Sequence, residues 1–505
     1  MNRLFVNVDT NDYGTKFLNI LTRENEKINS EDLYSFIDQY RGSGITDLLI
    51  CLNCQYSIPE SRFFSDSVFK YEQKIENGIP VDYTKRFSGF YIVYKIYGID
   101  PIKVWLDRCR DIGLNPWVSF RMNDCHFPDE KTCFWRPELF YKARDRGWMI
   151  GEKYGYFKNC LNYAIPEIRN IWLSYIDEQL SRYDMYGVEL DFLREIYCFD
   201  YLNEPDCCNI MTDFIRNVRN LVKKHEKIKG HSIRLSVRLM RDLNQCKAFG
   251  FDALTWDKER LVDLIVLSAR WETSDSDMPI SEWKSSLKNT QICAGLETLL
   301  APFVSPQLSS SPEVVRGYAN RYLSDGSDGI YLFNYYCVPN DFSEKETLRT
   351  ERSMEIFSTC ADLKSIEENS IRYIVTRQDI APKGFQKYDP LPINLNKEGK
   401  RITLKIGKLS PKHKVTVFVG YREASPEDTT FLVFGKKVYN MERAFPKPHD
   451  PYAAPKNLPE NCKCGYVPPD TVTYKAPLEL RMDGIYTLEF IGEHGSVTYI
   501  EFDIE

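Results

Sequence analysis

Residues 117–126 read Trp-Val-Ser-Phe-Arg-Met-Asn-Asp-Cys-His, and this stretch decides which fold we expect. Its first half alternates apolar and polar side chains, which is typical of a β-strand with one face against hydrophobic neighbours. Ser119, Arg121 and Asn123 share the polar face. Such a face suits a barrel strand whose outer side packs on helices and whose inner side opens into a site.

Strands and helices alternate along roughly the first 360 residues. Eight strands are expected at 4–9, 47–53, 117–123, 187–192, 233–239, 261–270, 291–297 and 329–334. Helical periodicity appears between them at 30–40, 101–111, 166–182, 210–223, 312–323 and 345–363. These units predict an α/β fold, a (β/α)8 TIM barrel over residues 1–367. Residues 55–98 form an aromatic-rich insertion after the second strand, expected to wall the site.

Short strand-like segments replace this alternation after residue 367. They are 371–377, 401–406, 414–421, 430–434, 478–482, 485–491 and 496–504, with a proline-rich loop at 446–469. Closely spaced strands separated by turn residues are typical of two packed antiparallel sheets. The sequence therefore predicts a C-terminal all-β sandwich domain over residues 368–505.

Composition argues against two kinds of partner. The net charge is -6 at pH 7 and no basic stripe stands out, which argues against nucleic-acid binding. No run of about 18 apolar residues is present to span a membrane. Residues 1–12 read as a strand and lack the apolar core and cleavage site of a signal peptide. We therefore expect a cytoplasmic protein by default, and a secreted one if a leader has been trimmed away.

The cysteines and histidines indicate neither a metal nor a cofactor. Fifteen cysteines are scattered without a disulfide framework, which fits reduced thiols in a chain of 505 residues. Neither Cys207-Cys208 nor Cys462-Lys463-Cys464 has the paired spacing of a zinc site. We expect no metal and no cofactor. A homodimer is one possible state of assembly.

Alternation along the strands places polar side chains at their C-terminal ends, where barrel proteins build their sites. The candidates are Asn7, Asp9, Asp12, Asn53, Arg121, Asn123, His126, Glu189, Asp191, Arg194, Glu195, Ser236, Arg238, Ser268, Arg270, Glu297 and Asn334. Carboxylates alone would suit a neutral glycosidase with an acid and a base. The arginines could instead converge on an anion, because a guanidinium binds a carboxylate through two parallel hydrogen bonds. Each arginine could also simply pair with a neighbouring carboxylate.

His126 is the only one of six histidines expected at the barrel mouth. An imidazole there could act as a general acid near neutral pH. The alternative is a structural or merely exposed histidine. No second histidine has metal-ligand spacing to it.

The segment from Arg121 to His126, Arg194 in the run 189–195, and an aspartate at the end of the first strand resemble glycoside hydrolase family 156. That family contains inverting exo-sialidases built as a TIM barrel with an appended β-sandwich. The resemblance extends over nearly the whole chain. It implies activity on sialylated glycans.

The resemblance also implies roles for particular residues. Asp9, or Asp12 as the second choice, would be the general base, and His126 the general acid. Arg121 and Arg194 would bind the sialic acid carboxylate, and Asn334 would help to hold the substrate. Asn123, Asp191 and Arg238 are further candidates for substrate binding because they are expected at the same mouth.

Two alternatives stay open. The first is another barrel glycosidase that uses Asp191 with Glu195 or Glu297 on a neutral or uronic sugar. The second is a barrel that binds sugar through its insertion and sandwich without catalysis, because a fold alone does not decide function.

Overall fold

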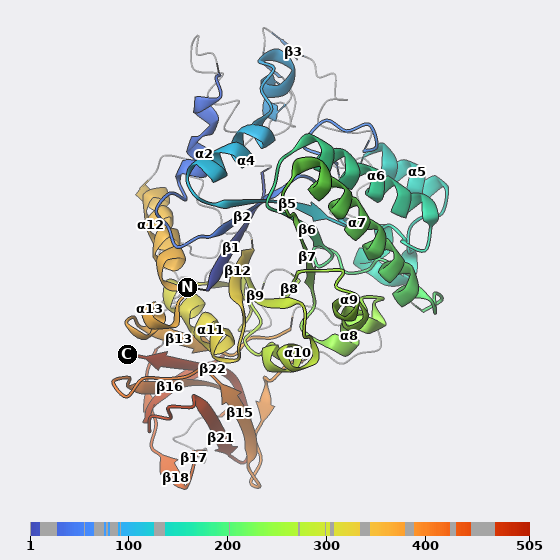
Figure 1. Ribbon diagram of the computed structural model, residues 1–505. Coiled ribbons are helices and arrows are strands. Elements are labelled where there is room, and N and C mark those ends of the chain that lie inside the picture. The colour runs from blue at the N-terminus through green and yellow to red at the C-terminus, as the bar shows by residue number, and fades with distance from the viewer. Residues whose placement is uncertain are drawn as a thin grey trace.

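The computed structural model describes residues 2–10, 28–54, 56–64, 75–76, 79–80, 89–90, 92–125, 137–200, 202–270, 273–297, 299–302, 308–333, 344–378, 388–424, 431–445 and 470–505. Within them, parallel strands form a closed barrel in the order β1-β12-β9-β8-β7-β6-β5-β2 (Figure 1). The bounds are β1 (Arg3–Val8), β2 (Asp47–Cys51), β5 (Asn115–Arg121), β6 (Gly187–Asp191), β7 (Arg234–Leu239), β8 (Leu264–Leu267), β9 (Gln291–Glu297) and β12 (Gly329–Phe333). This arrangement confirms the predicted TIM barrel.

Helices surround the barrel, and several begin at a clear sequence signal. The helices that follow barrel strands include α4 (Pro101–Asp111), α5 (Glu138–Asp145), α6 (Pro166–Arg182), α7 (Cys207–Lys229), α8 (Leu243–Ala248), α9 (Ala253–Lys258), α10 (Ile280–Ser286), α11 (Pro312–Ser324), α12 (Glu344–Thr359) and α13 (Leu363–Glu367). Proline occupies the first turn of α4, α6 and α11, where its missing amide costs no hydrogen bond. The side chain of Asp100 caps α4 by accepting from the Lys103 amide at 3.1 Å. Local sequence therefore fixes where these helices start.

The barrel interior confirms the alternation on which the site prediction depends. One buried hydrophobic cluster consists of Phe5, Leu49, Trp117, Leu264, Val266, Cys293, Tyr331 and Phe333, all from barrel strands. On β5, the inward Trp117 shares its face with Arg121, because side chains two apart point the same way. On β12 the inward residues are Tyr331 and Phe333, and the predicted inward position of Asn334 stays a prediction. Asn334 itself lies outside the described residues.

Besides shifts in the ends of other elements, three expected elements are broken up or displaced in the structure. The helix expected at 30–40 is a 3-10 turn, η1 (Glu31–Leu33), followed by the short α2 (Ser35–Asp38). The single helix expected at 345–363 ends as α12 at Thr359. A second helix, α13, follows, and the side chain of Asp362 caps its start by accepting from the Ser365 amide at 3.0 Å. The strand expected at 478–482 instead lies at β20 (Val472–Leu478). Pro477 inside that strand explains the error, since proline donates no ladder hydrogen bond and usually marks a strand end.

The C-terminal residues form two antiparallel sheets, which confirms the predicted β domain. One has the order β13-β22-β16-β20-β19 with β14 paired to β22, and the other has the order β15-β21-β17-β18. The strands are β13 (Ile371–Ile374), β14 (Ile393–Asn394), β15 (Lys400–Lys405), β16 (Val415–Arg422), β17 (Phe431–Phe434), β18 (Lys437–Tyr439), β19 (Glu442–Arg443), β21 (Ile485–Ile491) and β22 (Ser496–Ile504). Rings meet between the sheets, with Tyr486 and Phe502 centroids 5.1 Å apart.

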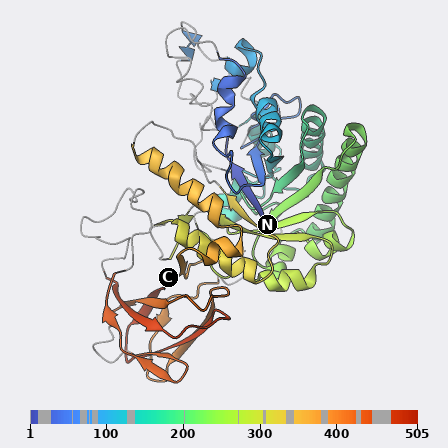
Figure 2. The same ribbon diagram turned by 60° about the vertical axis from the view of Figure 1, so that its left-hand side comes forward.

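The C-terminal sheets pack directly on the barrel through α11 and β13. Figures 1 and 2 both show the orange and red strands beside the yellow α11. A Cβ added to Gly317 on α11 would lie 1.9 Å from the Arg372 carbonyl oxygen of β13, so only glycine allows this approach. The Tyr318 hydroxyl donates to the Ile374 carbonyl at 2.8 Å. The expected boundary after residue 367 falls between α13 and β13 and, as a domain boundary, stays a prediction.

Candidate active site

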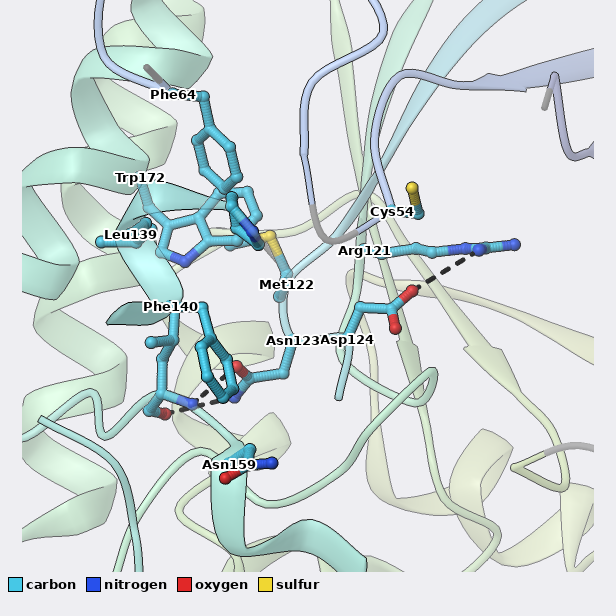
Figure 3. A pocket seen from close by; sticks show the side chains of 12 residues that line it. Cys54, Phe64, Arg121, Met122, Asn123, Asp124, Leu139, Phe140, Asn159 and Trp172 are labelled. Carbon is cyan, nitrogen blue, oxygen red and sulfur yellow. Dashed lines mark hydrogen bonds and ion pairs between the residues drawn. The ribbon is translucent and has the colours of Figure 1, made fainter. Parts of the chain in front are cut away.

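An ion pair joins two of the predicted site residues at the C-terminal end of the barrel. Arg121, the last residue of β5, donates from Nη2 to Oδ2 of Asp9, just past the end of β1, at 2.9 Å. Asp124 approaches the same guanidinium, with Oδ2 3.6 Å from Nη1 (Figure 3). The side chains of Arg121 and Asp9 are 5% and 16% exposed. Arg121 therefore lies between two carboxylates, and Asp9 is the one that solvent reaches.

The strand-end residues of β6 and β7 bind each other. Nε and Nη2 of Arg238 donate to the two carboxylate oxygens of Asp191 at 2.8 and 2.9 Å. Asp191 Oδ1 also accepts from the backbone amides of Leu193 and Arg194, each at 3.0 Å. The Arg238 guanidinium lies 3.8 Å from the ring centroid of Phe333, and both members of the pair are fully buried. The two predicted substrate-binding side chains are thus engaged with each other, and Asp191 holds the backbone of Arg194.

Arg270, which is partly exposed, forms a second ion pair near the mouth with the buried Glu195. Nε and Nη2 of Arg270 donate to Glu195 Oε2 at 3.0 and 2.8 Å. The Tyr156 hydroxyl donates to Glu195 Oε1 at 3.3 Å. Burial raises the pKa of the Glu195 carboxyl above its usual value, against the opposing charges of Arg270 and Arg194. The arrangement makes Glu195 easier to protonate than an ordinary surface glutamate.

Glu189 lies on the same inward face of β6 as Asp191, two residues before it and deeper in the barrel. Its Oε1 accepts from Asn7 Nδ2 at 3.2 Å, Ser119 Oγ at 2.7 Å and Tyr331 Oη at 2.9 Å. Burial, followed by the charge of Asp191, raises the pKa of Glu189 to about 7. Three strands thus donate to one buried carboxyl, which fixes the floor beneath the mouth.

Asn123 links two loops rather than leaving its amide toward the mouth. Its Nδ2 donates to the carbonyls of Leu161 and Tyr197 at 3.2 and 3.1 Å, and its Oδ1 accepts from the Leu161 amide at 2.9 Å. Two residues later, the Cys125 thiol donates to the Tyr156 carbonyl at 3.6 Å. The chain after β5 is therefore fixed against the segment 156–161.

Three predicted site residues, Asp12, His126 and Asn334, lie outside the described residues. Arg194 is described and buried, and its backbone follows β6 as expected. Strand-end reasoning missed Asp124 and Tyr156, which are not on strands. The signal for Asp124 was its place three residues after Arg121, whereas nothing in the sequence marked Tyr156.

A small cavity adjoins the candidate site between β5 and α6. It holds about 40 Å³, and its lining includes Arg121, Asp124 and Trp172. Figure 3 shows these side chains with Phe64 of the insertion, whose ring centroid lies 5.2 Å from that of Trp172. Such a volume suits a few water molecules and not a sugar.

The described part of the chain shows three further features. Its eleven cysteines are free thiols. No group of three or more His, Cys, Asp or Glu within it could hold a metal ion. None of its helices is long and apolar enough to cross a membrane.

The fold and its polar strand ends define a TIM-barrel protein with a C-terminal β domain. No protein-family model and no curated protein matches the chain, so the resemblance to family 156 rests on the residues alone. Among solved structures, an α-L-fucosidase from Vibrio sp. strain EJY3 is similar at 11% identity and a TM-score of 0.41, covering 99% of this chain and 96% of that chain.

Two further similar structures come from Paenibacillus. α-L-Fucosidase isoenzyme 2 from P. thiaminolyticus has 10% identity and a TM-score of 0.41. The match covers 74% of this chain and 51% of that chain, so it spans about half of the length of the fucosidase. A glycoside hydrolase family 18 N-acetylglucosaminidase from P. barengoltzii has 10% identity and a TM-score of 0.37, over 71% and 99%. All three are glycoside hydrolases, but at these TM-scores the similarity carries no argument about substrate or catalytic residues.

Proposed function

We propose that this chain is a glycoside hydrolase that removes a terminal sialic acid from glycoconjugates with inversion at the anomeric carbon. The observation that carries this proposal is the 2.9 Å contact between Arg121 and Asp9. Sialic acid bears its carboxylate on the anomeric carbon itself. A guanidinium that binds this carboxylate must therefore lie beside the base that directs water to the same carbon. Arg121 and Asp9 meet that requirement.

The proposed reaction is a single displacement. Arg121 binds the sugar carboxylate and Asp9 accepts a proton from water, whose oxygen attacks the anomeric carbon. The bond from that carbon to the departing oxygen breaks, and His126 donates a proton to that oxygen. The products are free sialic acid and an alcohol, with the configuration inverted. Arg194 and Asn334 complete the binding of the substrate in this proposal.

Asp191 and Arg238 support the proposed site from beneath. Asp191 accepts the backbone amide of Arg194 at 3.0 Å, so it positions the residue proposed to bind the carboxylate together with Arg121. Its two oxygens already accept four hydrogen bonds, two of them from Arg238. This occupancy leaves little room for Asp191 to attack a sugar or to activate water.

A second candidate function is a glycosidase that acts on a neutral or uronic sugar through carboxylates. The raised pKa of the buried Glu195 favours it, because a general acid must hold its proton near neutral pH. The saturated hydrogen bonding of Asp191 argues against its use as the partner carboxylate.

A substrate panel and the configuration of the first product test the proposal. We expect release of sialic acid from sialyllactose and no hydrolysis of neutral aryl glycosides such as aryl fucosides. Proton NMR of the first product from an α-sialoside should show β-sialic acid. Initial α product would exclude inversion, and hydrolysis of neutral or uronic aryl glycosides alone would favour the second candidate. The Asp9→Asn protein serves as the matched control for contaminating activity.

A further inference from the structure

We propose that Tyr156 forms a binding platform for the sugar ring on the leaving-group side of the cleaved bond. This subsite rests on the proposed function, because it assigns a position relative to the departing oxygen. Tyr156 lies in the 3-10 segment η3 (Glu152–Asn159) and is 38% exposed. The groups that hold it, Glu195 and Arg270, are largely buried.

The ring is held in place by polar contacts and by a cation. The Tyr156 hydroxyl donates to Glu195 Oε1 at 3.3 Å, and the Arg270 guanidinium lies 5.2 Å from the centroid of the Tyr156 ring. Arg270 is itself fixed by two hydrogen bonds to Glu195. A ring that is already oriented loses little conformational freedom when a ligand binds.

Neighbouring rings support the platform from its side. Phe157 meets Tyr156 edge to face at a centroid distance of 5.2 Å. Phe157 also stacks on Tyr197 at 4.4 Å, and Tyr197 contacts Phe249 at 5.0 Å. The aromatic cluster joins η3 to the chain after β6 and to the end of α8. Tyr156 is the member of this cluster that remains exposed to a ligand.

The chain after β5 places Tyr156 on the leaving-group side. The Cys125 thiol donates to the Tyr156 carbonyl at 3.6 Å, and the next residue in sequence is His126, the proposed proton donor. Cys125, the residue that precedes the proposed donor in the sequence, therefore contacts Tyr156. Because the donor protonates the departing oxygen, the group attached to that oxygen lies toward Tyr156.

The chemistry of the platform suits an uncharged pyranose ring. A tyrosine ring offers an apolar face to the C–H groups of a sugar and keeps a polar edge. The Glu195 and Arg270 charges beneath it offset each other at 2.8 Å. An ion-paired floor offers no net charge to attract a second acidic sugar.

Kinetics with two sialosides test the platform. We expect Tyr156→Ala to raise KM for sialyllactose by about tenfold, equivalent to about 1.4 kcal/mol, while kcat/KM for methyl α-sialoside, which lacks the second sugar, stays near the parent value. Tyr156→Phe keeps the ring and its contact with Arg270 but loses the hydrogen bond to Glu195, so it should raise the KM for sialyllactose much less than Tyr156→Ala does. Phe445→Ala removes another exposed aromatic ring, in the C-terminal domain, and should leave the kinetic constants for both sialosides unchanged. Equal losses on both sialosides, or an unchanged KM for sialyllactose in Tyr156→Ala, would overturn the proposal.

Lactose binding separates this proposal from the proposed function. Saturation-transfer NMR should show lactose bound to the parent and to Tyr156→Phe, and lost in Tyr156→Ala. If the parent hydrolyses no sialoside yet shows this pattern, the proposed function fails and the sugar platform stands without its leaving-group assignment. If the parent hydrolyses sialyllactose but binds lactose no better than Tyr156→Ala does, the platform fails and the function stands.

Discussion

The carboxylate of Asp191 and the guanidinium of Arg238 form two hydrogen bonds, of 2.8 and 2.9 Å, between adjacent strands of the barrel. The two residues occupy directly paired positions of β6 and β7. Neither side chain is accessible to solvent, so the charge of each is offset mainly by the opposite charge of its partner. The polar mouth therefore rests on a buried ion pair, and its geometry depends on the stability of the barrel.

Replacing Arg238 with methionine should destabilise the protein strongly. The change leaves Asp191 as a buried charge with only backbone donors, and breaking such a pair costs about 3–5 kcal/mol. Urea unfolding monitored by tryptophan fluorescence gives the free energy of unfolding. The double variant Asp191→Asn/Arg238→Met should recover part of the loss. Arg41→Met, which removes an exposed pair with Asp38, is the control and should change stability by less than about 1 kcal/mol. Parent-like stability of Arg238→Met would show that the pair is not structural.

Glu189→Gln should change how stability depends on pH. The folded state holds the Glu189 proton up to about pH 7, whereas the unfolded chain releases it near the ordinary value of 4.5. Ionisation thus favours the unfolded state, and the stability that Glu189 contributes is lost as the pH rises from about 4.5 to 7. Glutamine can still accept from Asn7, Ser119 and Tyr331 and carries no charge. Between pH 5 and 8 we expect the free energy of unfolding of the variant to rise above that of the parent by up to about 3 kcal/mol. Parallel stability curves across this range would contradict the raised pKa.

Arg121→Ala should lower kcat/KM on sialyllactose by about 10²–10⁴, since two hydrogen bonds between charged groups are worth about 3–6 kcal/mol together. Arg121→Lys keeps the charge but cannot form the two parallel bonds, and its activity should lie between those of the alanine variant and the parent. Because Arg121 also pairs with Asp9, thermal unfolding of each variant must be measured beside the kinetics. Near-parent hydrolysis by the alanine variant would remove Arg121 from the proposed binding of the carboxylate.

Asp9→Asn should lower kcat by about 10²–10⁴ with a smaller change in KM, because an amide cannot accept a proton from water. The Asp9 side chain is 16% exposed, and Arg121 keeps Asp124 as a second carboxylate neighbour, so we expect little loss of stability. Asp38→Asn, at a surface ion pair on α2, is the matched control. If Asp9→Asn retains parent kcat, the base lies elsewhere, and Asp12→Asn is the next variant to measure.

The sequence predicted the barrel and much of its polar face because strand geometry is local. Side chains two apart on a strand must point the same way, so the inward position of Trp117 carries Arg121 with it. The last barrel strand shows the same alternation. The actual inward residues of β12 are Tyr331 and Phe333. Local pattern also missed β20, where Pro477 lies within a strand.

Only the tertiary structure decided which charges meet. The sequence offered several carboxylates for each arginine, and the choice depends on the register between neighbouring strands. That register pairs Asp191 with Arg238 across β6 and β7, and the pairing of β2 with both β1 and β5 brings Asp9 of the first strand to Arg121 of the third. It also places Tyr156, from a segment with no strand pattern, beside Glu195. Alternation along each strand therefore determined from the sequence which residues face the inside of the barrel. Which arginine pairs with which carboxylate was decided only in the folded barrel, because these ion pairs join strands that are distant in the chain.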